Sequence, residues 1–289
     1  MRIGIIGAGK VGISIGHVLQ RKGFHVTTVS DVTGKNAFDR ARPYLGEDVL
    51  YTTDNVSAAE ASDIIAITTQ DGFIKDVAAE IAEKGKSLEG KLFFHTSGAH
   101  PSSILKPLDE RGAVLGSLHP LQTFPDIDSA IHVLPSTYIF VEGTVHALPR
   151  LEILGKSIGL TTVPIEGDDK VYYHLSAVFV CNLLCALLYA GEAIMKRINI
   201  GLEPFFPIIR ATLENIESRG PLMSLTGPII RGDTGTVEDH IRAMDDMEIH
   251  KRIYKALSLS ALDMAKKRSV LNQETLIDLE HILEAINDE

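Results

Sequence analysis

The sequence has little cysteine and no excess of positive charge. Its 289 residues include two cysteines, and 28 Lys and Arg stand against 38 Asp and Glu, a formal net charge of −10. Cys181 and Cys185 lie four residues apart in an apolar run and form neither a CxxC pair nor a zinc site. We expect two small core side chains in a reducing compartment and no bound metal. No run of basic residues offsets the acidic balance, which disfavours nucleic acid as a partner.

The sequence also lacks an apolar run of full membrane-spanning length. The N-terminal stretch MRIGIIGAGKVG is laced with glycine and has neither the unbroken apolar core nor the cleavage site of a signal peptide. The longest apolar run, residues 175–190, is a little short for a membrane span and contains Ser176 and Asn182. A helix that is apolar all round more often forms the centre of a bundle or of a dimer interface. We therefore expect a cytoplasmic homodimer without a membrane partner.

Short apolar runs alternate with helical patterns over the first part of the chain. This alternation indicates parallel βαβ units, and so an α/β fold with a doubly wound parallel sheet, followed by helices alone. The expected strands are 2–7, 25–30, 48–52, 63–68, 91–95, 113–118, 136–142 and 161–165. The expected helices are one that ends near residue 22, then 54–61, 72–84, 100–111, 144–158, 168–197, 201–218, 236–244, 246–268 and 273–287. We predict an α/β domain over residues 1–164 and an all-helical domain over residues 165–289.

Three glycines with the spacing Gly7-x-Gly9-x-x-Gly12 follow the first strand and open the first helix. Gly7 permits the tight turn, Gly9 lets the backbone approach a pyrophosphate, and Gly12 lets the helix pack on the strand. The helix N-terminus adds free N–H groups and a partial positive charge. The pattern predicts a Rossmann dinucleotide site, although the glycines could serve the turn alone. The expected cofactor contacts are Gly7, Ala8, Gly9, Lys10, Val11 and Gly12.

The end of the second strand bears on the choice between NAD and NADP. An acidic residue about twenty positions past the glycines usually binds the ribose 2′-hydroxyl of NAD and would repel a 2′-phosphate, and Asp31 stands at about that distance. Ser30 could occupy the contact position instead. Lys35, Arg40 and Arg42 are near enough in sequence to meet a phosphate. These residues slightly favour NAD as the cofactor and do not exclude NADP.

Small polar residues follow two further strands. Ligands of open α/β sheets lie beyond the carboxyl ends of the strands, and both sets fall there. These residues could also be ordinary loop chemistry. We expect the cofactor's ribose and nicotinamide side to be lined by Thr68, Thr69, Gln70 and Thr96, and the substrate to meet Ser97 and Gly98.

The stretch GSLHPLQTFP places a histidine at a strand end on the same rim. Pro120 restricts His119 to extended backbone and stops the strand. An imidazole there could exchange a proton with a substrate oxygen while hydride moves to or from a nicotinamide. It could equally hydrogen-bond a loop carbonyl and do nothing more.

Two more polar clusters belong to the helical part. Lys170 and His174 are four apart near the start of the long helix, so they share a face and could act as acid or anchor, with Asn182 farther along. A solvated first turn is the alternative. Farther on, Thr226, Arg231, Asp233, Thr236 and His240 crowd a short stretch. Arg231 could hold a carboxylate in bidentate fashion, whereas Asp233 or Thr236 could cap the next helix.

Four segments together resemble one family: HTSGAHPSSIL, GSLHPLQTFP, KVYYHLSAVFVCN and TGPIIRGDTGTVEDH. The family comprises Rossmann-like oxidoreductases whose C-terminal part is the domain of unknown function 2520, and the resemblance runs from Met1 to about residue 265. The architecture is also similar to prephenate dehydrogenase, pyrroline carboxylate reductase and the β-hydroxyacid dehydrogenases, with a helical domain like that of phosphogluconate dehydrogenase. The resemblance implies a nicotinamide cofactor, a cleft between two domains and dimerisation through the helices.

The same resemblance implies roles for particular residues. His119-Pro120 looks like the His-Pro motif of prephenate dehydrogenase, whose histidine contacts the reacting hydroxyl. Lys170 and Asn182 are placed like the lysine and asparagine that serve this chemistry in β-hydroxyacid dehydrogenases. The family often carries Ser-Arg after the second strand, which suits NADP, and this chain has Ser30-Asp31 instead.

The expected function is hydride transfer between NAD or NADP and a small, carboxylate-bearing substrate, either a carbonyl/hydroxy or an imine/amine compound. His119, Lys170 and His174 are the expected catalytic residues. Asn182, Thr226, Arg231 and His240 are expected to contact the substrate together with the Ser97-Gly98 loop. The alternative is a dinucleotide-binding sensor or assembly protein without turnover.

Overall fold

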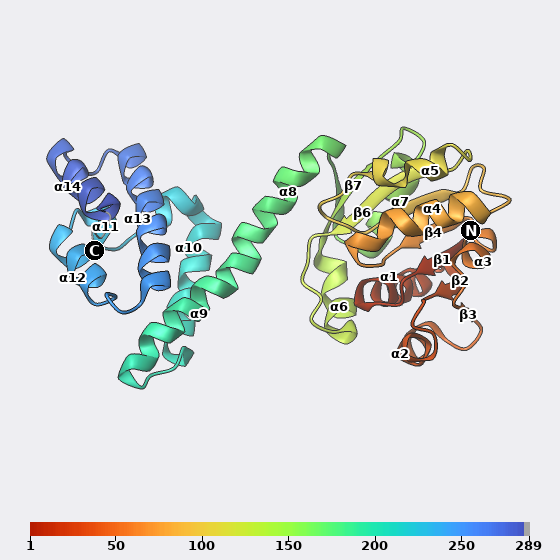
Figure 1. The fold of residues 1–289 in the computed structure, drawn as a ribbon, viewed down its shortest axis with the longest axis horizontal. Helices are drawn as coiled ribbons and strands as arrows, with labels where there is room; N and C mark the ends of the chain where they lie inside the picture. Colours follow the sequence, from red (N-terminus) through yellow and green to blue (C-terminus); the bar gives the residue numbers. More distant parts are fainter. Residues whose placement is uncertain (286–289) are drawn as a thin grey trace. The chain divides into compact units, whose positions relative to one another are not determined.

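The computed structural model describes residues 1–285 and contains two compact units. The sheet unit is Met1–Asn182 and the helical unit is Leu183–Glu289, of which residues 183–285 are described. The chain therefore divides inside the long helix, so that the first half of this helix belongs with the sheet (Figure 1).

The sheet contains the eight expected strands. Their order across the sheet is β3-β2-β1-β4-β5-β6-β7-β8. The strands are β1 (Arg2–Ile6), β2 (His25–Ser30), β3 (Leu50–Thr52), β4 (Ile64–Ile67), β5 (Leu92–His95), β6 (Val114–Pro120), β7 (Tyr138–Gly143) and β8 (Thr161–Pro164). The first six are parallel, β7 runs antiparallel to β6, and β8 is parallel to β7. The doubly wound sheet is confirmed, with one antiparallel junction that the sequence did not reveal.

The strand order reverses direction between β1 and β4. The chain first builds outward from β1 to β2 and β3, then returns to the other side of β1 with β4. Parallel sheets bind ligands beyond the carboxyl ends of the strands at such a switch point. The loops after β1, β2, β4, β5 and β6 are therefore the ones that matter for the site.

Helices cover both faces of the sheet (Figure 1). On one face lie α1 (Lys10–Arg21), α2 (Lys35–Leu45), α6 (Ile127–Val133) and α7 (Leu148–Ile158), and on the other lie α3 (Asn55–Glu60), α4 (Ile74–Lys84) and α5 (Lys106–Asp109). Single 3₁₀ turns are η1 (Asp71–Phe73), η2 (Ser102–Leu105), η3 (Leu134–Ser136) and η4 (Gly167–Asp169).

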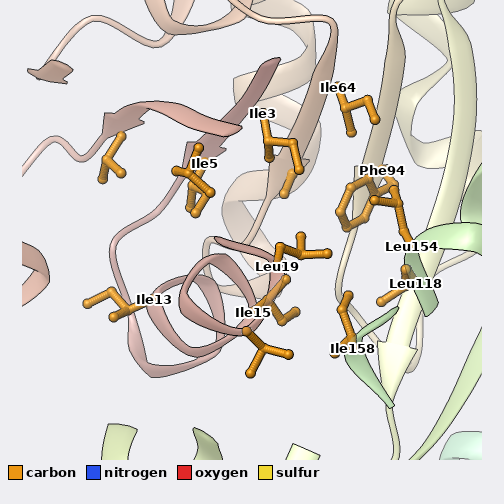
Figure 2. Packing of buried hydrophobic residues seen from close by; sticks show 14 of the residues in the cluster. Ile3, Ile5, Ile13, Ile15, Leu19, Ile64, Phe94, Leu118, Leu154 and Ile158 are labelled. Carbon is orange, nitrogen blue, oxygen red and sulfur yellow. The ribbon is translucent and has the colours of Figure 1, made fainter. Parts of the chain in front are cut away.

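Strand side chains alternate between two hydrophobic clusters, one under each helical layer. Ile5, Ile64 and Phe94 enter the first cluster, where Figure 2 shows them gathered with Ile15 and Leu19 of α1. The intervening residues of the same strands enter the second cluster. Because both faces are buried, the strands read as continuous apolar runs. This packing fixes the strand ends that carry the polar side chains.

A long helix leads from the sheet unit into the helical unit. It begins with α8 (Lys170–Ala177), passes through a π-helical turn, η5 (Val178–Asn182), and continues as α9 (Leu183–Met195). The helical run Gly167–Ile198 is long and apolar enough to cross a membrane by length and composition. Little of its most apolar window is buried, so it is not a core helix of the single chain. Cys181 and Cys185 are exposed, so the expectation of core cysteines is wrong for the single chain.

The helical unit has a small core of its own, formed by Ile229, Val237, Leu262, Leu279 and Leu283. Its other elements are η6 (Lys196–Ile198), η7 (Glu203–Phe205), α10 (Phe206–Ser224), α11 (Pro228–Arg231), α12 (Thr234–Arg242), α13 (Glu248–Arg268) and α14 (Gln273–Glu284). Two Gly-Pro pairs interrupt the helices: Gly220 kinks α10 at φ 77° and Gly227 precedes α11 at φ 108°. The last two residues of the helix predicted at 273–287 lie outside the described part of the chain.

Candidate functional site

The glycine turn has the geometry that its spacing predicts. Gly7 has φ +101°, and a Cβ there would lie 2.8 Å from the backbone of Thr68 and Thr69. A Cβ at Gly12 would lie 2.5 Å from the Gly7 carbonyl oxygen, so α1 could not pack this close with a larger residue. Gly9 is different, because no atom lies within 4 Å of the position that its Cβ would take. The turn thus leaves open backbone at the start of α1.

The side chains at the end of β2 play distinct parts. Ser30 is fully buried, and its hydroxyl donates to Asn55 Oδ1 at 2.6 Å, so it does not occupy the contact position. The Asp31 carboxylate accepts the Ala8 N–H at 2.8 Å and two hydrogen bonds from Thr33. Arg40 donates to the Ala8 carbonyl oxygen at 2.8 Å. Asp31 and Arg40 therefore hold the two peptide groups on either side of the Ala8 α-carbon, in the middle of the glycine turn.

A cleft of about 360 Å³ lies along the carboxyl ends of β1, β2 and β4. Its lining comprises Ile6, Gly7, Gly9, Asp31, Val32, Thr33, Arg40, Asn55, Thr68, Thr69, Gln70, Phe73 and Val77. The Thr69 hydroxyl is buried and has no hydrogen-bond partner among residues 1–285, which is costly unless a ligand or water satisfies it. The Thr68 hydroxyl, in contrast, donates a hydrogen bond to the Gly7 carbonyl at 2.7 Å.

Six of the predicted cofactor residues thus line this cleft: Gly7, Gly9, Asp31, Thr68, Thr69 and Gln70. The other six do not line it. Ala8 is held by Asp31 and Arg40, Lys10 donates to the Pro125 carbonyl at 2.6 Å, and Gly12 packs under the turn. Val11 packs against the core, Ser30 is buried, and the Thr96 N–H donates to the Ile67 carbonyl at 3.3 Å.

The loop after β5 is held rigidly. The Ser97 hydroxyl donates to Asp71 Oδ2 at 2.7 Å and accepts the N–H groups of Ala99 and His100, both at 3.2 Å. Ser97 is 4% exposed. Its hydroxyl therefore shapes the loop, and the neighbouring Gly98 is buried.

Lys170 lies beneath that loop, in the interior of the sheet unit. Only 2% of the residue is exposed, and its ammonium donates to the Ser97 carbonyl at 2.9 Å and to the Ser117 hydroxyl. Burial lowers the pKa of Lys170 to about 8, against the opposing effect of Glu142 and Asp71. The ammonium joins the loop after β5, strand β6 and the start of α8.

His119, the next-to-last residue of β6, faces α8. Its Nδ1 lies 2.6 Å from the Tyr173 hydroxyl, and the Tyr173 ring stacks on Phe140 at a centroid distance of 4.0 Å. Burial, together with the charges of Lys170 and His174, lowers the pKa of His119 to about 3. At neutral pH the imidazole is therefore uncharged.

His174 completes this group from the same helix as Lys170. The rings of His119 and His174 lie 6.4 Å apart at a steep angle, and His174 Nδ1 is buried with no hydrogen-bond partner in the described part of the chain. A Cβ at Gly98 would lie 2.8 Å from His174 Nδ1 and 2.9 Å from His119 Nε2. Both ring nitrogens thus face the same glycine. Gly98, His119, Lys170 and His174 are brought together as predicted, and Tyr173, which sequence reasoning missed, joins them.

The remaining candidates are outside this cluster. Asn182 ends the π-helical turn and is exposed. Thr226, Arg231 and His240 are exposed side chains of the helical unit, and His240 Nδ1 lies 3.0 Å from the Tyr254 hydroxyl. Their roles toward a substrate stay predictions. Within residues 1–285, no three His, Cys, Asp or Glu side chains come together as metal ligands.

Asp233 takes the helix-capping role that the sequence left open. Its carboxylate accepts the Thr236 N–H at 3.1 Å and the Thr236 hydroxyl at 2.7 Å, and α12 starts at the next residue. Both side chains are therefore engaged in the cap.

Two family models match most of the chain. Residues 1–120 match the Rossmann-like domain, and residues 137–261 match the domain of unknown function DUF2520, which confirms the resemblance. A candidate NADP oxidoreductase from Bacteroides fragilis is 23% identical, with 90% of this chain and 96% of that one covered at a TM-score of 0.75. A Thermotoga maritima protein is 21% identical over 93% of this chain and 100% of that one, at a TM-score of 0.73.

An imine reductase from Myxococcus stipitatus in complex with NADP+ is 16% identical over 98% of this chain and 100% of that one, at a TM-score of 0.68. These identities show a shared fold. No curated protein matches the sequence.

Proposed function

Because the chain joins a Rossmann-like domain to a DUF2520 domain, we propose that it is an NAD(P)-dependent oxidoreductase. The observation that carries the proposal is the cleft at the switch point of the sheet. Open backbone at Gly9 and the unpartnered Thr69 hydroxyl both face it. A dinucleotide needs this combination, since its pyrophosphate approaches bare backbone at a helix N-terminus and its riboses need polar partners.

The residues present fit such a cofactor. Gly9 and the first N–H groups of α1 would hold the pyrophosphate, Asp31 the adenosine ribose, and Thr69 with Gln70 the nicotinamide side. The Asp31 carboxylate at the cleft disfavours a 2′-phosphate, which supports NAD over NADP. Asp31→Asn keeps an acceptor for the Ala8 N–H and removes the charge. It should raise the ratio of NADPH to NADH affinity about tenfold, or about 1.4 kcal/mol, and an unchanged ratio would count against this assignment. Asp39→Asn, on the exposed face of α2, is the matched control.

A bound nicotinamide supplies the hydride, and the chain's own residues handle the proton. His119 stands at the rim of the same sheet, so it can hydrogen-bond the oxygen or nitrogen of the substrate. Because its pKa is about 3, it is an uncharged partner rather than a strong acid at neutral pH. Neutral imidazole is sufficient to polarise a carbonyl in some enzymes.

Two observations support an imine substrate within this class. An imine reductase shares the fold over nearly the whole chain. An imine nitrogen is more basic than a carbonyl oxygen and needs less help from a strong acid, which suits an uncharged His119.

The experiment is a screen of the purified protein with NADH and with NADPH, followed by the loss of absorbance of the reduced cofactor. The compounds are cyclic imines and 2-oxo acids of similar size. Oxidation of the cofactor by cyclic imines alone supports imine reduction, and oxidation by 2-oxo acids supports a dehydrogenase of hydroxy acids. Tight cofactor binding without turnover on either set would instead favour a sensor.

We also propose that a second copy of the chain covers the long helix. Five large apolar side chains on η5 and α9 are between 43% and 72% exposed: Phe179, Val180, Leu183, Leu187 and Tyr189. Large apolar side chains exposed in this number along one helix mark an interface. A membrane is the poorer explanation, because the same helical run starts from Lys170, whose ammonium is buried and hydrogen-bonded inside the sheet unit.

Light scattering during gel filtration tests this interface. The wild-type protein should elute as a dimer, and Phe179→Glu with Tyr189→Glu should convert it to a monomer. Val145→Glu introduces the same charge at a 75% exposed valine in the turn before α7 and should leave the dimer intact. A wild-type monomer that floats with lipid vesicles would contradict the proposal.

A further inference from the structure

Tyr173 makes one hydrogen bond, and it is to His119. Its hydroxyl lies 2.6 Å from His119 Nδ1, and no second partner of this hydroxyl is found among residues 1–285. The ring is fixed independently of that bond, since it stacks on Phe140 of β7. The Tyr173 hydroxyl is therefore fixed in place beside the His119 ring.

The direction of the hydrogen bond follows from its length and from the partners of the hydroxyl. Bonds donated by N–H are usually about 2.9 Å long, whereas those donated by O–H are about 2.7 Å, and this one is shorter still. A half-buried phenol also needs an acceptor for its proton, and His119 Nδ1 is the one that the described residues offer. Tyr173 therefore donates and His119 Nδ1 accepts.

An uncharged imidazole carries one proton, so acceptance at Nδ1 places that proton on Nε2. Nε2 is the atom that faces Gly98, opposite the unpartnered Nδ1 of His174. The buried Gly98 thus has the Nε2 donor of His119 and the Nδ1 of His174 beside the same position, the one that a Cβ would take.

We propose that Tyr173 is a positioning residue that fixes His119 as its Nε2–H tautomer. His119 then offers a donor, rather than a lone pair, on the side of its ring that faces Gly98, and a substrate that reaches this nitrogen must bring an acceptor, a carbonyl oxygen or an imine nitrogen. The selection of a substrate rests on the proposed function, whereas the tautomer is a property of the protein alone.

The test is ¹⁵N NMR of the histidine rings in the full-length protein at neutral pH, with the His119 signals assigned by their loss in His119→Gln. In a neutral ring the nitrogen without a proton resonates far downfield of the protonated one. The wild type should show His119 with a bare Nδ1 and a protonated Nε2. A wild-type spectrum with the proton on Nδ1 overturns the proposal, whatever any variant does.

Tyr173→Phe keeps the ring on Phe140 and removes only the hydroxyl. It should shift both His119 nitrogen signals toward the average of the two tautomers, and unchanged signals would overturn the proposal. Tyr172→Phe removes the hydroxyl of the preceding tyrosine, which is 70% exposed, and should leave the signals in place. Titration of the same samples with NADH and NADPH separates the two claims. A fixed Nε2–H tautomer in a protein that binds neither cofactor would retain this inference and refute the oxidoreductase.

Discussion

Lys170 is a charged residue in the interior of the sheet unit, and its surroundings explain why it is there. A buried ammonium destabilises the fold unless its N–H groups are hydrogen-bonded. The Lys170 ammonium donates to the Ser97 carbonyl and to the Ser117 hydroxyl. The sequence suggested an acid or a carboxylate anchor. The contacts support a different part: Lys170 joins three segments, and its charge adds to the burial that keeps the neighbouring His119 uncharged.

Lys170→Met tests the electrostatic half of this account. The change keeps most of the side-chain volume and removes the positive charge, so the pKa of His119 should rise from about 3 while burial still holds it below the usual value of a histidine. The His119 ring signals should then begin to move at a higher pH on acidification. Lys106→Met, at an exposed lysine of α5, should leave that pH unchanged. An unaltered His119 titration in the Lys170 variant would contradict the account.

Individual site residues were predictable where one local rule governs them. Gly7, Gly9 and Gly12 follow from backbone geometry, and the acidic residue at the end of β2 follows from its spacing. Tyr173 was not predictable, because its partner His119 lies 54 positions away in the chain and meets it only after β6 and α8 have packed.

The strands of the sheet were predictable because burial on both faces leaves short continuous apolar runs. Two helices on the same sheet were not. The sequence of α2 has few apolar residues and contains Pro43, and α6 spans only Ile127–Val133 and depends on a cap from Asp126. The antiparallel return of β7 was also invisible, because strand direction is set by the connection and not by the strand's own residues.

The cap of α12 makes a prediction about the helical unit. Asp233→Ala removes the acceptor for the Thr236 N–H and should lower the free energy of unfolding by about 1 kcal/mol. Urea unfolding followed by circular dichroism measures the change. Asp239→Ala, in an exposed pair with Arg242, should cost about half as much or less. Equal effects of the two variants would show that Asp233 is not the cap that the contacts indicate.

Acid should destabilise the molecule before its carboxylates titrate. Burial, with the charge of Lys170, lowers the pKa of His95 to about 3, and His119 behaves alike, whereas an unfolded histidine titrates near about 6.5. The unfolded chain therefore binds more protons between these values. The stabilisation is complete above about pH 6.5 and is lost as pH falls toward about 3.

Thermal unfolding at about pH 7.5 and about pH 5 should show the loss, with about 2 kcal/mol from His95 alone. His95→Gln can still donate to the Pro101 carbonyl and should flatten the dependence. His146→Gln, in the exposed turn before α7, should not. A pH dependence that persists in full without His95 would rule out this explanation.

The central claim is that the glycine turn binds a dinucleotide, and fluorescence titration with NADH and NADPH of the wild type and of Gly9→Ala tests it most directly. Gly9 has ordinary extended backbone and empty space around its α-carbon, so the variant should fold with an unchanged melting temperature. Its methyl group would stand where the pyrophosphate must approach. Gly235→Ala, on α12 with equally open surroundings, is the control. The account predicts micromolar binding of at least one cofactor by the wild type and the control, and at least a tenfold weaker affinity, about 1.4 kcal/mol, for Gly9→Ala. Equal affinity in all three proteins, or no binding by the wild type, would contradict it.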